Sequence, residues 1–192
     1  DGRGRSMTHP NEPVSDFERD TLPWLADVRR YAYRLTGSAA DADDLTQITF
    51  LNAFRGWHTF RPGSDVRRWL FAIARNAHFR NRPRREKLVA TEDAELESLA
   101  AATDSGRASE ALEALERIDL AAGIDAEIAR LADAYREAVL MVDVEGLSYE
   151  EAAAQAGVPV GTIRSRLYRA RRQLQQALIA RAEDAGLIGG TE

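Results

Sequence analysis

The stretch Gly146–Leu174, GLSYEEAAAQAGVPVGTIRSRLYRARRQL, decides the fold of the second half of the chain. Ser148, followed three residues later by Glu151, forms a capping-box pattern that starts a helix. Gly157 suits the left-handed conformation that ends a helix, and Pro159 suits the start of the next one. The sequence therefore predicts two helices joined by a tight turn.

The second of these helices has two different sides. An apolar stripe at helical spacing predicts a buried face, made by Ile163, Leu167, Ala170 and Leu174. The other side is expected to display polar and basic residues, namely Thr162, Arg164, Ser165, Tyr168, Arg169 and Arg172. An ordinary helical hairpin with a solvated arginine face is the alternative. The capping pattern, the small residues of the first helix and the arginine bias together favour a DNA-binding helix-turn-helix.

Length and composition exclude several classes of protein. A chain of 192 residues forms one large domain or two small ones. The absence of cysteine excludes disulfides, thiol catalysis and cysteine-based zinc sites. No apolar run approaches the roughly 20 residues of a membrane span, and we expect a cytoplasmic protein. The residues DGRGRS before Met7 are expected to be a cloning remnant.

Charge is sorted along the chain, although the net charge is only -5. Residues 67–87 contain eight basic residues and one acid, whereas residues 88–128 contain eleven acids and two basic residues. Residues 161–181 contain six arginines and no acid. This order predicts two basic surfaces separated by an acidic tether.

The periodicity predicts an all-α fold of two small helical domains joined by an acidic linker, the second domain containing the helix-turn-helix. The segment GSAADADD has the character of a helix start, FRPGSD (60–65) interrupts the helical pattern, and Pro83 is expected to end the next helix. The expected divisions are a flexible N-terminus (1–21), a first domain (22–87), the linker (88–124), a second domain (125–185) and a tail (186–192).

The first domain carries a second nucleic-acid signal. Arg68, Arg75 and Arg82 lie seven residues apart and share one helical face. Aromatic residues interleaved with cations suit single-stranded DNA, because bases stack on flat side chains while cations follow the backbone. The candidate stacking residues are Trp69, Phe71, His78 and Phe79, although Trp69 and Phe71 are more often core residues.

Taken together, the segments DADDLTQITFLNAFRGWHTFRPGSDVRRWLFAIARN and GLSYEEAAAQAGVPVGTIRSRLYRAR resemble bacterial sigma factors of the extracytoplasmic-function group. The resemblance covers residues 22–87 and 125–181. It implies an alternative sigma factor that binds core RNA polymerase and promoter DNA, with an anti-sigma factor as a further partner. It implies neither a cofactor nor a metal.

The resemblance also implies roles for individual residues. The polymerase-docking surface would be formed by Asp41, Asp43, Asp44 and Gln47. The promoter -10 element would be bound by Phe60, Arg61, Ser64, Asp65, Arg75, Asn76, Phe79 and Arg80. The -35 element would be bound by Thr162, Arg164, Ser165, Tyr168, Arg169 and Arg172. The chain departs from many members at Arg80, where they carry an acid, and at Pro83, where they carry a base.

Two other classes of protein fit the sequence less well. A self-sufficient helix-turn-helix repressor would explain the second domain but would leave the first without a role. An enzyme is disfavoured because the three histidines, His9, His58 and His78, match no metal-binding or catalytic spacing.

Overall fold

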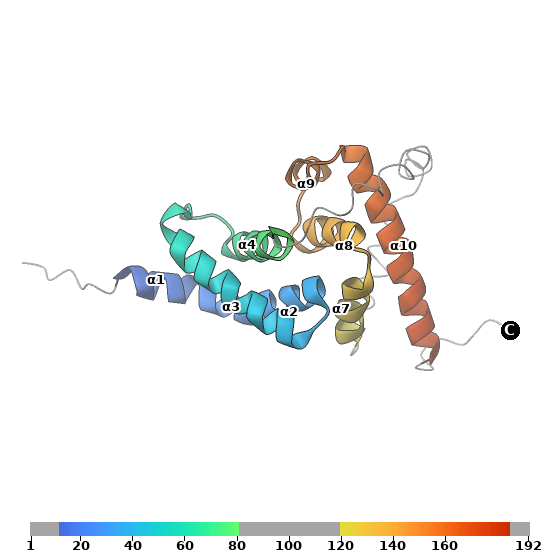
Figure 1. The fold of residues 1–192 in the computed structure, drawn as a ribbon, viewed down its shortest axis with the longest axis horizontal. Helices are drawn as coiled ribbons and strands as arrows, with labels where there is room; N and C mark the ends of the chain where they lie inside the picture. Colours follow the sequence, from blue (N-terminus) through green and yellow to red (C-terminus); the bar gives the residue numbers. More distant parts are fainter. Residues whose placement is uncertain (1–11, 81–119, 185–192) are drawn as a thin grey trace, which may run out of the picture.

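The computed structural model describes residues 12–80 and 120–184, and both ranges are helical (Figure 1). The first block contains α1 (Glu12–Thr21), α2 (Leu25–Thr36), α3 (Ala39–Gly56) and α4 (Val66–Arg80). The second block contains α7 (Leu120–Arg130), α8 (Asp133–Val139), α9 (Tyr149–Ala156) and α10 (Val160–Asp184). These two ranges contain no strand, and the prediction of an all-α fold is confirmed.

The first block is built around α2, which packs against both α3 and α4. Gly37, at φ +72°, ends α2, and Ser38 begins α3 by accepting the N–H of Asp41 at 3.3 Å. The acidic segment therefore starts a helix, as its composition predicts. The loop between α3 and α4 falls on FRPGSD, where Gly63 adopts φ +84°.

The second block begins earlier than its periodicity suggests, because α7 starts at Leu120 rather than Asp125. Helix α8 continues into a π-helical turn, Leu140–Val144, whose end is marked by a bond from the Glu145 N–H to the Leu140 carbonyl at 2.9 Å. Helix α10 is the longest described helix and runs along the outer side of the block (Figure 1).

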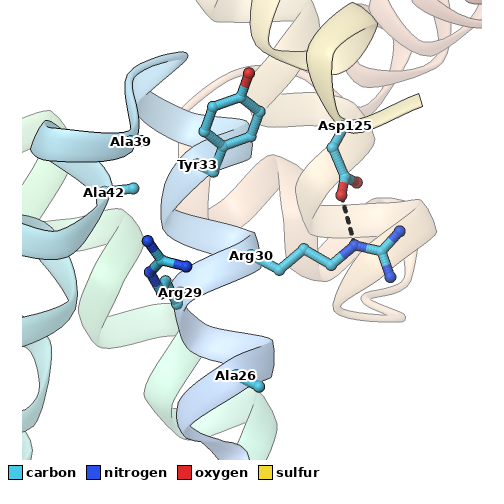
Figure 2. Close-up of a pocket in the computed structure, with 7 residues that line it drawn as sticks. All are labelled: Ala26, Arg29, Arg30, Tyr33, Ala39, Ala42 and Asp125. Carbon is cyan, nitrogen blue, oxygen red and sulfur yellow. Dashed lines mark hydrogen bonds and ion pairs between the residues drawn. The ribbon is translucent and has the colours of Figure 1, made fainter. Parts of the chain in front are cut away.

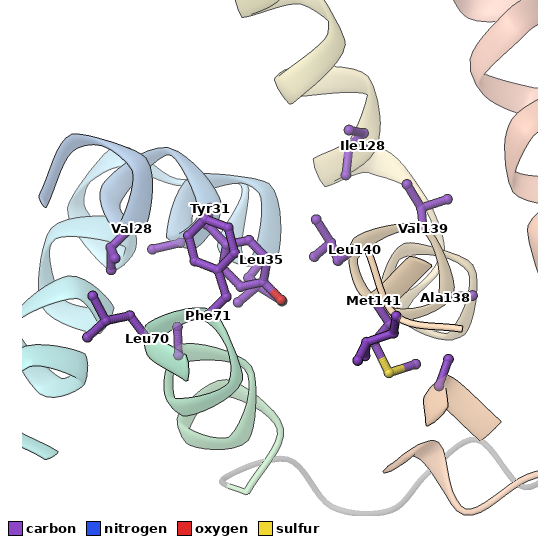
Figure 3. Packing of buried hydrophobic residues seen from close by; sticks show 14 of the residues in the cluster. Val28, Tyr31, Leu35, Leu70, Phe71, Ile128, Ala138, Val139, Leu140 and Met141 are labelled. Atoms are coloured by element: carbon purple, nitrogen blue, oxygen red, sulfur yellow. The ribbon is translucent and has the colours of Figure 1, made fainter. Parts of the chain in front are cut away.

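The two blocks are not separate in space. Helix α7 packs against α2 of the first block as well as against α10 of its own. The buried apolar residues of both blocks form one continuous cluster, and Figure 3 shows Tyr31 and Leu35 of the first block facing Leu140 and Met141 of the second. Pro83 lies outside the described residues, and so does most of the expected linker, residues 88–124, of which only 120–124 are described.

Among the residues that the structure describes, no helix has both the length and the apolar character needed to cross a bilayer.

Candidate nucleic-acid interface

The start of the helix-turn-helix has the predicted capping geometry. The Ser148 hydroxyl accepts the N–H of Glu151 at 3.1 Å, and the Glu151 carboxylate accepts the N–H of Ser148 at 2.8 Å. Gly157 ends α9 at φ +67°. The carbonyl of Pro159 then accepts the Thr162 N–H at 3.0 Å at the start of α10. The predicted helix, turn and second helix are confirmed.

The predicted buried stripe of α10 is also confirmed, since all four of its residues are buried. On the opposite side Arg164 and Arg172 are exposed, while Thr162, Tyr168 and Arg169 are partly exposed. Arg164 lies over the ring of Tyr149 with its guanidinium carbon 5.8 Å from the ring centre. Arg164 and Arg172 thus have the exposure that contact with DNA requires.

Two α10 residues behave differently from expectation. Ser165 is 2% exposed and its hydroxyl donates to the Thr162 carbonyl at 3.0 Å, so the expectation that it is displayed is wrong. A short hydroxyl side chain is readily satisfied by the preceding turn of its own helix. Arg169 donates to the Tyr135 hydroxyl at 3.1 Å and is therefore oriented by α8.

The FRPGSD loop adjoins an aromatic cluster. Phe60 stacks on Trp57 with ring centres 5.0 Å apart and planes 6° apart, and the Trp69 ring lies 5.0 Å from Phe60. Arg61 and Ser64 of the loop are exposed. The cluster offers flat, partly exposed rings, which is what base stacking requires.

Asp65 has a structural role in this loop, because its carboxylate accepts the N–H of Arg68 at 3.0 Å at the start of α4. Asn76 and Arg80 are exposed further along α4, and the ring of Phe79 meets that of His78 edge-on. These residues remain candidates for contact with single-stranded DNA.

Phe71 is a core residue, as the alternative interpretation had it. It is 1% exposed and stacks on Tyr31 with ring centres 4.3 Å apart. The guanidinium of Arg67 covers the ring at 4.6 Å. A base cannot reach this ring, so the prediction of a stacking role for Phe71 is wrong.

Arg75 is likewise buried, with 3% of its surface exposed. It donates to both oxygens of Glu145 and to the side-chain oxygen of Gln155, both in the second block. Arg68 on the same face donates to Glu151 at 3.0 Å. Arg68 and Arg75 share a face of α4 as predicted, but in this structure that face contacts the second block instead of being open to DNA. The third residue of the predicted face, Arg82, lies outside the described residues.

The Glu145 carboxylate affects the pKa values of both Arg75 and Tyr31. Burial lowers the pKa of Arg75, but Glu145, Tyr31 and Glu137 together outweigh that effect, and the pKa lies above its usual value. Burial raises the pKa of Tyr31 well above 10.0, and the Glu145 charge adds to that rise. Arg75 is therefore charged, and Tyr31 is a neutral donor to Glu145 at 2.6 Å.

The predicted polymerase-docking residues lie near the start of α3. Asp41, Asp44 and Gln47 are exposed, whereas Asp43 is held by Arg29 at 2.5 Å. The bond from Arg29 lowers the pKa of Asp43. Asp43 is thus engaged within its own block.

Sequence reasoning missed the apolar part of the α3 surface. Ile48 is 44% exposed, Leu51 56% and Phe54 50%. Leu45, Ile48 and Leu51 recur at helical spacing, and periodicity alone assigns such residues to the core. The signal that could have found them is the excess of apolar residues over what one buried stripe of α3 needs.

A cavity of about 410 Å³ lies between α2, α3 and α7 (Figure 2). Three cationic or aromatic side chains line it, Arg29, Arg30 and Tyr33. Arg29 is paired with Asp43, and Arg30 bonds to Asp125 at 2.5 Å. Both arginines that line the cavity therefore already have an acidic partner within the protein.

Comparison with known proteins shows which family the chain belongs to. Residues 23–87 match Sigma-70 region 2, and residues 122–174 match Sigma-70, region 4. The chain is 39% identical to the ECF RNA polymerase sigma factor EcfG of Rhodopseudomonas palustris, over 91% of this chain and 92% of that protein. The chain belongs to the extracytoplasmic-function group of RNA polymerase sigma factors.

Other members agree with this assignment. The ECF RNA polymerase sigma factor SigC of Mycobacterium tuberculosis is 41% identical over 85% of this chain and 81% of its own length. The solved structure of the sigma factor RpoE from Bartonella quintana, in complex with the anti-sigma factor NepR, matches with a TM-score of 0.57. That match has 28% identity and covers 86% of this chain and 98% of the other.

The sigma factor therefore directs promoter-specific transcription, and the predicted resemblance is confirmed. A stand-alone repressor is not supported, because the first block matches a sigma region and has a role of its own. Sigma factors are initiation factors that work with RNA polymerase.

Proposed function

We propose that this sigma factor divides its work among three surfaces. Helix α10 reads the promoter -35 element, the FRPGSD loop and the exposed side of α4 hold the melted -10 element, and α3 docks on the clamp of core RNA polymerase. The observation that carries the proposal is that one chain has both an arginine-displaying helix, α10, and an α3 face with large exposed apolar residues.

Exposure and position support the assignment of α10. Arg164 and Tyr168 lie in the first turns of the helix, where a groove-inserted helix meets base edges. Arg172 lies further along and is exposed, which suits a phosphate contact. Thr162 and Arg169 complete the candidate surface, whereas Ser165 is buried and does not belong to it.

The -10 assignment rests on the loop and the aromatic cluster beside it. Phe60 offers a stacked, partly exposed ring, and Gly63 gives the loop a conformation that other residues rarely adopt. Asn76 and Arg80 are exposed on α4. Arg75 joins this surface only when it is released from Glu145.

The α3 assignment rests on the mixture of acidic and apolar residues on one exposed face. Asp44 supplies an exposed carboxylate, and Ile48 and Leu51 supply exposed apolar area close by on the same helix. Exposed apolar residues of this size beside polar ones are typical of a protein interface.

We further propose that an anti-sigma factor covers these surfaces, as the Bartonella quintana relative was solved bound to one. The chain itself would catalyse no reaction, since the polymerase carries out the chemistry. It would act in the cytoplasm, where RNA polymerase works.

Run-off transcription with core RNA polymerase and a promoter library tests the proposal. Polymerase alone should be inactive on promoters that the full chain activates, and Asn76→Ala should reduce permanganate reactivity of unpaired thymines without abolishing recruitment. Tight sequence-specific binding of the protein alone, combined with no effect on polymerase, would contradict the proposal.

A further inference from the structure

A buried ion pair joins the two blocks. The side chains of Arg75 and Glu145 are only 4% and 1% exposed. Glu145 also accepts the Tyr31 hydroxyl at 2.6 Å, and Arg75 also donates to Gln155. Residues from α2, α4, α9 and the end of the π-helical turn thus meet in one polar cluster, which we call the Arg75 cluster.

The π-helical turn places Glu145 in this cluster. A π-helical turn contains one residue more than an α-turn and so redirects the residues that follow it. Glu145 comes directly after the turn, and Gly146 at φ +71° then leads the chain away toward α9. Such turns are frequent at functional sites.

Further contacts join the two blocks. Asp125 of α7 accepts Arg30 at 2.5 Å and Arg34 at 2.6 Å, both from α2. Arg136 of α8 donates to the Leu35 carbonyl at the end of α2. Together with the apolar contact in Figure 3, these bonds form a specific interface between the two blocks. We call this state, with the two blocks in contact, the closed arrangement.

The closed arrangement and nucleic acid require the same arginine. A guanidinium binds carboxylates and phosphates with the same N–H donors. Nη1 of Arg75 donates to both oxygens of Glu145 and Nη2 donates to Gln155, so a phosphate can accept from these nitrogens only after they are released. Arg75 precedes Asn76 on α4, at the surface proposed for the -10 element. While Glu145 holds it, Arg75 is buried and cannot reach a phosphate.

We infer that Glu145 is an internal competitor for promoter DNA. It holds Arg75 in the closed chain, and the two blocks must separate before Arg75 can bind a backbone phosphate. This inference rests on the proposed function for what Arg75 binds. The closure itself rests only on the contacts between the blocks.

The test uses the full chain with dyes on two introduced cysteines. The chain has no native cysteine, so Asn52→Cys in α3 and Gln176→Cys in α10, both at exposed positions, label only these sites. Energy transfer between the dyes reports closure. Fluorescence anisotropy with a labelled, mixed-sequence single-stranded oligonucleotide reports DNA binding.

Four variants separate the effects. Glu145→Gln should lower energy transfer and tighten oligonucleotide binding about tenfold, because the binding-competent form is no longer a minor one. Arg75→Gln should also lower energy transfer, but it should not tighten oligonucleotide binding. Tyr31→Phe removes a neutral hydrogen bond and leaves the Arg75–Glu145 ion pair in place. Its energy transfer and its oligonucleotide affinity should lie between those of wild type and Glu145→Gln. Asp143→Asn is the matched control, since Asp143 bonds to Arg171 of its own block.

Two results would overturn the inference. One is wild-type energy transfer in both Glu145→Gln and Tyr31→Phe, with helical circular dichroism preserved. The other is an equal gain in oligonucleotide affinity for Arg75→Gln and Glu145→Gln, since Arg75 would then not be the released contact. Failure of the proposed function is seen separately, as the absence of wild-type run-off transcription.

Discussion

At the scale of single residues, Arg164 and Arg172 of α10 are predicted to make different kinds of contact with DNA. Arg164→Ala should cost about 1–3 kcal/mol on a matched -35 duplex and relax the preference at one or two positions, because it removes a base contact. Arg172→Ala should weaken all sequences alike and reduce the salt slope by about one unit, because it removes a phosphate contact. Titration of both variants on matched and mismatched duplexes at two salt concentrations measures this.

The control for that comparison is Arg171→Ala. Arg171 bonds to Asp143 at 2.6 Å within the block, so its loss should change stability more than sequence preference. Indistinguishable binding profiles for Arg164→Ala and Arg172→Ala would mean that α10 presents a different face to DNA.

A second residue, Glu137 of α8, should make stability depend on pH. Burial raises the pKa of Glu137 above 4.5, and nearby Arg75 and Arg166 oppose that rise only in part. A carboxyl whose pKa is raised by folding binds more protons in the folded state. The free energy of unfolding therefore falls as pH rises through the range above 4.5.

Glu137→Gln is predicted to remove this dependence, giving a variant more stable than wild type at pH 7 and equal to it at low pH. Urea unfolding at several pH values measures the effect. Glu150→Gln, which alters an exposed carboxylate on α9, is the control. Parallel stability curves for wild type and Glu137→Gln would show that the burial of Glu137 does not affect folding.

At the scale of elements, α3 is predicted to bind polymerase through its exposed face. Asp44→Lys and Leu51→Ser should each weaken the binding of core polymerase about tenfold, since such substitutions at the centre of an interface commonly cost about 1–2 kcal/mol. Asp43→Asn should have a smaller effect, because Arg29 already holds that carboxylate. Competition for core polymerase, with helicity checked by circular dichroism, gives the affinities.

Unchanged binding for both Asp44→Lys and Leu51→Ser would exclude this face of α3 from docking. A loss with Asp43→Asn equal to that with Asp44→Lys would point to folding of α3 instead, because Asp43 links α3 to α2.

Individual helices could be predicted because their signals are local. Ser148, Glu151 and Gly157 lie within ten residues of one another, and each does in the structure what its chemistry suggests. The buried stripe of α10 follows from 3.6-residue periodicity alone. Periodicity fails for Leu51, which fits the pattern but is exposed, because a pattern cannot distinguish the core from a surface that awaits a partner.

At the scale of the whole molecule, the contacts between the blocks could not be predicted from the sequence. Arg75 and Glu145 lie 70 residues apart, and Tyr31 and Glu145 lie 114 apart. Nothing near Arg75 in the sequence indicates a buried partner, and arginines are rarely buried without one. The sequence predicted a DNA-facing arginine because it shows the basic cluster and not the acid that folds onto it.

The continuous core leads to the last prediction, that the two blocks unfold together. All three tryptophans, Trp24, Trp57 and Trp69, lie in the first block, so tryptophan fluorescence reports that block alone, whereas far-ultraviolet circular dichroism reports both. In wild type the two urea transitions should coincide. Leu140→Ala in the second block should lower both midpoints, because it leaves a cavity where the blocks meet and costs about 2–5 kcal/mol. Leu178→Ala is the control: Leu178 is 4% exposed but lies outside the continuous cluster, so the fluorescence midpoint should fall less than with Leu140→Ala. If Leu140→Ala shifted only the circular dichroism transition, the blocks would be folding independently, and the shared core would not couple them.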